Sequence, residues 1–217
     1  MSAAPKHGYW IIHINKVHDM AKLREMIAAA STKTKRGGVI RVNSPVTKVL
    51  TGDPVVQAVV VEFPCLEDAM GAWDDMEDYG AARAILGDPE SNVVERRVCV
   101  LEADPLPELK DGAGLWINLV EKVLDEDKFM SYVGASMPNF TGATFGPVVH
   151  QHVGDKQMQF AAVLTFESIE ASVNVWQKAE YIEAKKKGTM EDGEEHVVVR
   201  TIACVEYKSQ NDDKINK

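Results

Sequence analysis

Glu62 and Arg41 are the first pair of residues whose types could carry out proton-transfer chemistry. Glu62 ends an apolar strand-like run, and a carboxyl group that is desolvated and unpaired there acquires a raised pKa. Such a group works as an acid or base near neutral pH, with Arg41 stabilising the negative charge that develops. The alternative is a structural carboxylate that pairs with Arg41 or with a backbone donor.

His13 is the second candidate for a catalytic base. It alternates with Tyr9, Ile11 and Asn15 on one face of a strand. If that face lines a cleft, His13 could act as an acid, a base or a metal ligand near physiological pH. The alternative is a hydrogen-bonded histidine within a sheet. Leu119 is its counterpart in the second half of the chain, so the two halves are chemically unequal.

His150 and His152 are a candidate metal site, because residues two apart on a strand point the same way. A metal usually needs a third and a fourth ligand, and no CxxC motif or carboxylate cluster lies beside them. We therefore favour a solvent-facing edge strand and predict neither a metal nor a cofactor. The sequence also contains no glycine-rich phosphate loop and no nucleophile elbow, which sets those classes of enzyme aside.

Aromatic side chains recur at matching places in the two halves of the chain. They are Trp10 with Trp116, Trp73 with Trp176, and Tyr79 with Tyr181. One interpretation is that they anchor helices to a sheet. The other is that some of them line a pocket for a flat apolar ligand, which would be formed by Tyr9, Trp10, Trp116 and Asn118. Asn118 places its polar group on the face opposite to Leu119.

The elements that must position these residues belong to an internal sequence repeat with two copies. Glu62-Phe63-Pro64-Cys65 is followed by Trp73, ten residues beyond the Phe, and Thr165-Phe166-Glu167-Ser168 is followed in the same way by Trp176. Each copy also has a Gly-Asp turn between two strand-like runs. Cys99 and Cys204 fall 105 residues apart, which favours equivalent places in a core.

Each copy reads β-α-β-β-α-β, the ferredoxin-like order, which predicts an α+β fold with an antiparallel sheet and both helices on one face. We place the copies at residues 8–103 and 112–207, joined by a linker over 104–111 and followed by a polar tail over 208–217. The bare face of each sheet should pack on the other copy. The chain would then form an intramolecular pseudo-dimer of the dimeric α/β-barrel type, with a ligand cleft between its sheets.

Composition narrows the classes of partner. A net charge of -9 over 217 residues argues against nucleic acid and anionic membranes, and no apolar run is long enough to span a bilayer. The three cysteines form no disulfide framework, and the first seven residues lack the apolar region of a signal peptide. We therefore expect a cytoplasmic protein whose partner is a small molecule and which could also form a homo-oligomer.

Several motifs of the first copy resemble the domain-of-unknown-function 1330 family, a branch of the dimeric α/β-barrel superfamily. They are Gly8-Tyr9-Trp10-Ile11, Gly37-Gly38-Val39-Ile40-Arg41, Gly52-Asp53, Glu62-Phe63-Pro64-Cys65 and the segment around Tyr79. The family usually has Glu before the Gly-Asp turn, where this chain has Thr51 and Val153. The resemblance implies the fold, and the wider superfamily includes cofactor-free oxygenases, cyclases, isomerases and haem-binding proteins.

Three hypotheses about function follow. The protein is an enzyme with cofactor-free proton-transfer chemistry at Glu62 or His13, a carrier or sensor of a small, largely apolar or aromatic molecule, or an oligomeric scaffold. Both candidate bases in one water-accessible cavity would favour the enzyme. An open cavity without convergent polar groups would favour the carrier, and a cleft filled by side chains would favour the scaffold.

Overall fold

The computed structural model describes residues 5–30, 35–188 and 197–209. Eight strands alternate with short helices in this part of the chain. The strands are β1 (His7–Val17), β2 (Val39–Thr51), β3 (Gln57–Phe63), β4 (Val94–Ala103), β5 (Gly114–Val123), β6 (Gly142–Val153), β7 (Phe160–Phe166) and β8 (Val198–Glu206). The α-helices are α1 (Met20–Ala29), α2 (Leu66–Gly71), α3 (Tyr79–Ala84), α4 (Glu126–Ser136), α5 (Ile169–Asn174) and α6 (Ala179–Gly188).

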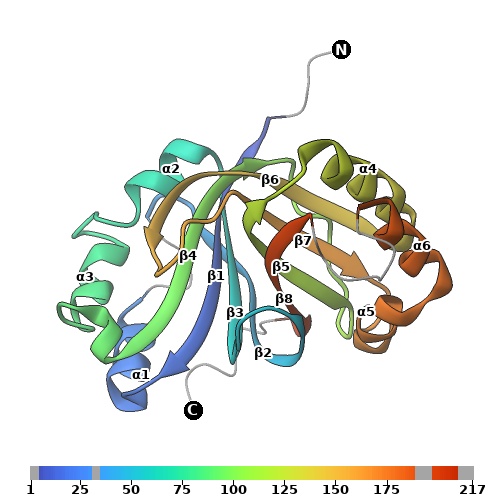
Figure 1. The fold of residues 1–217 in the computed structure, drawn as a ribbon. Coiled ribbons are helices and arrows are strands. Elements are labelled where there is room, and N and C mark those ends of the chain that lie inside the picture. Colours follow the sequence, from blue (N-terminus) through green and yellow to red (C-terminus); the bar gives the residue numbers. More distant parts are fainter. Residues whose placement is uncertain (1–4, 31–34, 189–196, 210–217) are drawn as a thin grey trace.

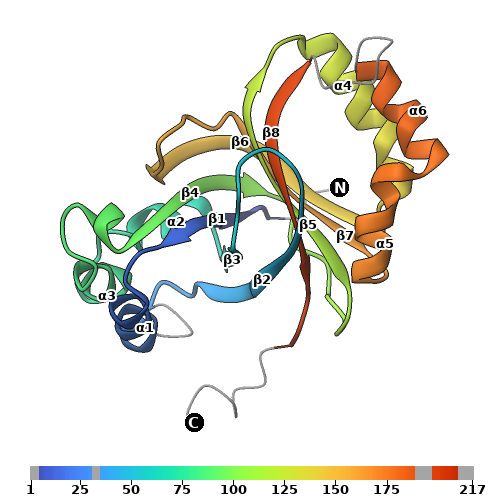
Figure 2. The same cartoon turned by 60° about the horizontal axis from the view of Figure 1, so that its bottom comes forward.

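The strands form a closed antiparallel barrel in the order β1-β3-β2-β8-β5-β7-β6-β4, so the fold is α+β as predicted. Helices α1, α2 and α3 cover one side of the strands and α4, α5 and α6 cover the other (Figure 1). The two groups of helices stay apart when the molecule is turned (Figure 2). No helix among the described residues has the length and apolar character needed to cross a bilayer.

Two long strands close the barrel by changing partners at a proline. β2 pairs with β3 as far as Pro45 and with β8 from Val46 onwards. β6 pairs with β7 as far as Pro147 and with β4 from Val148 onwards. A proline has no N–H to donate to a ladder, so it suits the point where one ladder ends and the next begins. Pro45 therefore does not break β2, which continues to Thr51.

The barrel interior is a packed core. β1 directs Tyr9 and Ile11 inwards, and β5 directs Leu115 and Ile117 inwards, all at most 1% exposed. Leu106, from the predicted linker 104–111, is also buried in this core. The prediction of a ligand cleft between the two sheets is therefore wrong, because side chains fill that space. Two further cores lie between the sheet and the helices.

Trp10 and Trp116 belong to these outer cores and do not face the barrel interior. Each indole N–H donates a 2.7 Å hydrogen bond to a helix carbonyl, Trp10 to Ala69 and Trp116 to Ser172. Rings from the helical layers pack against them; for example, Trp73, in the turn that follows α2, lies 5.5 Å from Trp10 between ring centroids. The prediction that these indoles line an inter-sheet pocket is thus overturned, while the anchoring interpretation holds.

Cys99 and Cys204 are both fully buried, as predicted for core residues, but they are not equivalent. Cys99 lies opposite Ile11 and faces the barrel interior. Cys204 lies opposite Trp116 and faces the helices. A separation of 105 residues is one too many to match the registers, and one residue along a strand reverses the face.

Of the predicted tail 208–217, only residues 208 and 209 are described, and His196 also lies outside the described residues. Asp19 and Asp125 cap α1 and α4, each accepting a bond from the backbone N–H three residues on. Ser168 caps α5, whereas Cys65 makes no such bond at α2.

Candidate functional site

Glu62 is the centre of a hydrogen-bonded cluster at one end of the barrel. Its carboxylate accepts a 2.6 Å bond from the Tyr9 hydroxyl, and the His7 Nδ1 atom lies 2.7 Å from it. Arg41 pairs with the other carboxylate oxygen. The backbone N–H of Leu106 also points to this carboxylate, at 3.3 Å. The geometry matches the structural interpretation of Glu62, and its catalytic role stays a prediction.

The electrostatics of this cluster keep Glu62 ionised. Burial by itself raises the pKa of the Glu62 carboxyl, but the hydrogen bonds from Tyr9 and His7 and the charge of Arg41 outweigh it and hold the pKa below its ordinary value. The same contacts act in the opposite sense on the phenol. Burial and the neighbouring carboxylate raise the pKa of Tyr9 far above its ordinary value. Tyr9 is therefore a hydrogen-bond donor here and no general base.

His13 faces the barrel interior, as the alternation in β1 predicts, and is fully buried. Its Nε2 atom lies 3.1 Å from the carbonyl of Ile117, and its Nδ1 atom has no partner among the described residues. Burial lowers the pKa of His13 to about 4, so the ring is neutral at physiological pH. Neither His13 nor Glu62 lines either of the two pockets described below.

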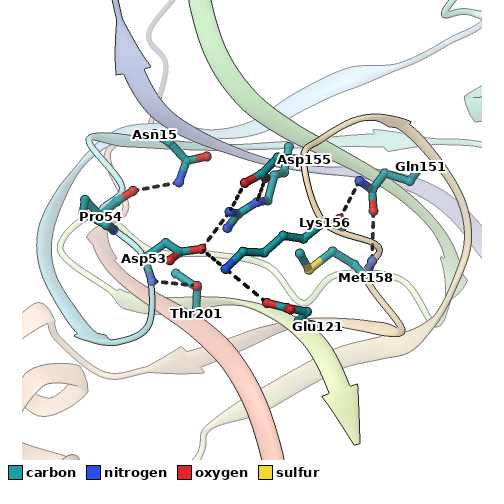
Figure 3. A network of polar contacts seen from close by, with 10 residues as sticks. Asn15, Asp53, Pro54, Glu121, Gln151, Asp155, Lys156, Met158 and Thr201 are labelled. Atoms are coloured by element: carbon teal, nitrogen blue, oxygen red, sulfur yellow. Dashed lines mark hydrogen bonds and ion pairs between the residues drawn. The ribbon is translucent and has the colours of Figure 1, made fainter. Parts of the chain in front are cut away.

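The first of these pockets is a polar cleft of about 740 Å³ at the hairpin end of the barrel. Arg97 lies at this end and bonds to Asp53 at 2.7 Å and to Asp155 at 2.8 Å. Lys156 bonds to Asp53 at 3.0 Å and pairs with Glu121 at 3.3 Å (Figure 3). The Gly-Asp turns of both halves thus meet through one arginine. These charges are matched to one another, so we assign this cleft no ligand.

The second pocket, which we call the α4 pocket, lies between α4 and the helix-facing side of β5, β6 and β7. Its volume is about 240 Å³. The apolar side chains that line it include Val120, Phe129, Met130, Val133, Met137, Phe140, Phe145, Phe160, Ala162 and Leu164. Lys6 and Glu102, from the other half of the chain, also reach it. Sequence reasoning placed no pocket here, because a residue in α4 gives no sign of how closely it packs.

Three polar side chains mark one border of the α4 pocket. Asn118 on β5 is 6% exposed and lies opposite Ala162 on β7. Arg200 on β8 donates a 2.8 Å bond to the Tyr132 hydroxyl, and Tyr132 in turn pairs with the Tyr181 hydroxyl. Of the four residues predicted to line a ligand cleft between the sheets, Asn118 lines the α4 pocket, which lies on the helix side of the sheet. Tyr9 belongs to the Glu62 cluster instead.

The corresponding place in the first half is built from different side chains. Ile12 lies opposite Val59, as Asn118 lies opposite Ala162. Leu23 and Met26 on α1 are buried in the core that contains Ile12. They stand four and seven residues beyond the capping Asp19, just as Phe129 and Tyr132 stand beyond Asp125. The small Ala162, where the first half has Val59, leaves room beside Asn118.

His150 and His152 lie in the part of β6 that pairs with β4, and their ring centroids are 4.7 Å apart. The His152 ring stacks on Trp73 with 4.4 Å between centroids, and burial lowers its pKa to about 4. The sequence suggested a solvent-facing edge strand here, and this interpretation is wrong for His152. Within the described ranges, no three His, Cys, Asp or Glu side chains gather in a way that could hold a metal ion.

A closed antiparallel barrel flanked by two sets of helices defines the class of the α/β-barrel proteins, and the comparisons agree. The chain resembles an anthrone oxidase-like protein of known structure, with a TM-score of 0.56, 10% identity, and coverage of 94% of this chain and 93% of that one. It also resembles a protein from Fusobacterium nucleatum proposed to be a monooxygenase, with a TM-score of 0.53, 10% identity, and coverage of 95% and 94%. At such identities the likeness shows the fold alone.

Residues 7–98 match the family described as Domain of unknown function (DUF1330). The resemblance seen in the motifs of the first copy is thereby confirmed. The match ends within β4, so β5 and the elements that form the α4 pocket lie outside it. No curated protein matches the sequence.

Proposed function

We propose that this protein binds a small, largely apolar aromatic molecule in the α4 pocket. The observation that carries the proposal is a cavity of about 240 Å³ with a mostly apolar lining and a few polar groups on one border. Ligand pockets commonly have this character. An engineered apolar cavity of about 150 Å³ holds benzene, so the α4 pocket suits one or two fused rings.

The finer interpretation of the fold belongs to this proposal. Residues 8–103 and 112–207 are two ferredoxin-like units that form a pseudo-dimer within one chain, joined by residues 104–111. The matching partner changes at Pro45 and Pro147 and the matching indole bonds support this interpretation. In it, the second unit has the ligand pocket and the first unit supports the barrel.

A carrier or sensor fits the geometry better than the enzyme hypothesis built on Glu62 and His13. Neither residue lines the α4 pocket, Glu62 is held ionised by four partners, and His13 is enclosed in the barrel core. The filled barrel interior by itself would favour a scaffold. The α4 pocket supports binding instead. Protein interiors are closely packed, so a purely structural protein is expected to fill such a space with side chains.

Ligand binding in the α4 pocket can be tested by filling the pocket with a larger side chain. Naphthalene and indole would be titrated into the wild-type protein and into Ala162→Leu, with binding followed by ligand-detected NMR. We expect binding to the wild type and its loss in the variant, because the added side-chain atoms occupy the space beside Asn118. Val59→Leu, which places the same leucine at the equivalent strand position of the first half, should bind as the wild type does. Equal binding by Ala162→Leu would overturn the proposal.

A further inference from the structure

Asn118 brings a buried polar group without a hydrogen-bond partner in the described part of the chain to the lining of the α4 pocket. Its amide oxygen is buried and has no hydrogen-bond partner among the described residues. The side chain lies on β5 between Ala162 on β7 and Ile202 on β8, and it lines the pocket. Leaving a buried acceptor without a donor is unfavourable, because the desolvation of that acceptor is not compensated. A group that supplies the missing donor would recover much of that free energy.

The fold itself does not require this amide. Ile12 occupies the equivalent place in β1 and packs among apolar side chains with no polar atom to satisfy. The other polar groups on this border already have partners, since Arg200 donates to Tyr132 and Tyr132 pairs with Tyr181. Ser136, at the end of α4, donates its own hydroxyl to the carbonyl of Val133 at 2.9 Å. Asn118 is thus the group whose bonding is incomplete until something enters the pocket.

We propose that the ligand of the α4 pocket is an aromatic alcohol whose hydroxyl group bonds to the Asn118 amide. This inference rests on the proposed function. A hydroxyl can donate to the amide oxygen and can also accept from the amide nitrogen, so it suits either orientation of the amide. An ether of the same size can only accept, and a hydrocarbon can do neither. The rings occupy the space between Phe129, Phe160 and Leu164.

Three probes of nearly equal shape separate these cases. Naphthalene, 2-methoxynaphthalene and 2-naphthol would be titrated into the wild-type protein by calorimetry. We expect 2-naphthol to bind about tenfold more tightly than the other two, because a site with an unpaired polar group discriminates against ligands that leave it unpaired. Equal affinities for the three probes would overturn the hydroxyl requirement and leave the proposed function standing. Failure of all three to bind would overturn both.

Asn118→Ile, which installs the residue of the first half, supplies the matched variant. Its affinity for naphthalene should equal or exceed that of the wild type, and its preference for 2-naphthol should vanish. A preference that survives in this variant would overturn the role of Asn118. The free energy of unfolding without ligand gives an independent readout, and we expect it to rise in Asn118→Ile because the unpaired acceptor is gone. A marked fall would show that the amide is already satisfied within the protein and would contradict the proposal.

Discussion

The hydroxyl of Tyr9 donates a 2.6 Å hydrogen bond to the carboxylate of Glu62 and accepts one of 2.8 Å from the backbone N–H of Leu106. This relationship joins β1, β3 and the segment that follows β4 at one end of the barrel. A carboxylate surrounded in this way is ionised before any ligand arrives, and its lone pairs are already in use. The residue that first suggested a catalytic base therefore serves as the anchor of the connection between the halves.

Glu62→Gln should lower the free energy of unfolding at pH 7 by about 1–3 kcal/mol, because Arg41 loses its charged partner and the amide cannot accept all the bonds made to the carboxylate. The loss would be measured by urea denaturation. Glu102→Gln on β4 changes an exposed carboxylate and should stay within about 0.5 kcal/mol of the wild type. Equal losses in both variants would show that the Glu62 cluster contributes nothing special.

His13 should make the protein less stable as the pH falls from about 6.5 to about 4. The folded pKa of His13 is lowered to about 4, so between these values the unfolded chain binds a proton that the folded chain does not. The stabilisation is fully present above the unfolded pKa and amounts to about 3 kcal/mol. Unfolding measured at pH 7, 6, 5 and 4 should show a shallower slope for His13→Leu than for the wild type. His152, with a similar pKa, lowers the stability in the same direction over this pH range.

Gly114 should not tolerate a side chain. A Cβ atom there would come within 2.2 Å of the carbonyl oxygen of Ser168, because the start of α5 packs directly on β5. Gly114→Ala should cost about 1–3 kcal/mol through this overlap with backbone. Gly134 in α4 has open space around its Cβ position, so Gly134→Ala should instead stabilise by about 0.5–1 kcal/mol through helix propensity. Thermal unfolding of the two variants checks this, and shifts of the same sign would contradict it.

Arg97 should matter more than either of its partners. It is 4% exposed and bonds to Asp53 and Asp155, so Arg97→Met removes the cation that these two carboxylates share, although Asp53 keeps its contact with Lys156. We expect a loss of about 2 kcal/mol or more at low ionic strength. Asp155 has a largely exposed side chain, and Asp155→Asn should cost less than about 1 kcal/mol. Urea denaturation at low and high salt distinguishes the two, because salt weakens the repulsion left in Arg97→Met.

Periodicity and repetition predicted the α+β fold and the order of strands and helices. Alternation put His13 on the same face as Tyr9, and both do face the barrel interior. The matched glycines before Trp10 and Trp116 allow a helix to sit directly on each strand. These features are local, since each depends on the spacing of neighbouring residues and on the face that a strand buries.

The cavity was not predictable, because it depends on how large side chains are across three elements that are distant in the sequence. The first half has Val59 where the second half has Ala162, and nothing in the sequence marks this difference as important. Only the pairing of β7 with β5 places Ala162 next to Asn118. The prediction of a cleft in the barrel interior failed for the opposite reason. Two bare sheets can enclose a cleft or fill it, and the choice depends on Leu106 and Met158, whose positions in the core no strand pattern reveals.

Because both halves of the barrel belong to one polypeptide, Ile12 and Asn118 are encoded separately. An assembly of two identical chains would carry the same residue at both places and could not change one without the other. Here a single codon can place an amide on one side while the opposite side stays apolar. Each chain should therefore take up one ligand molecule, and the half without the amide is free to be selected for rigidity alone.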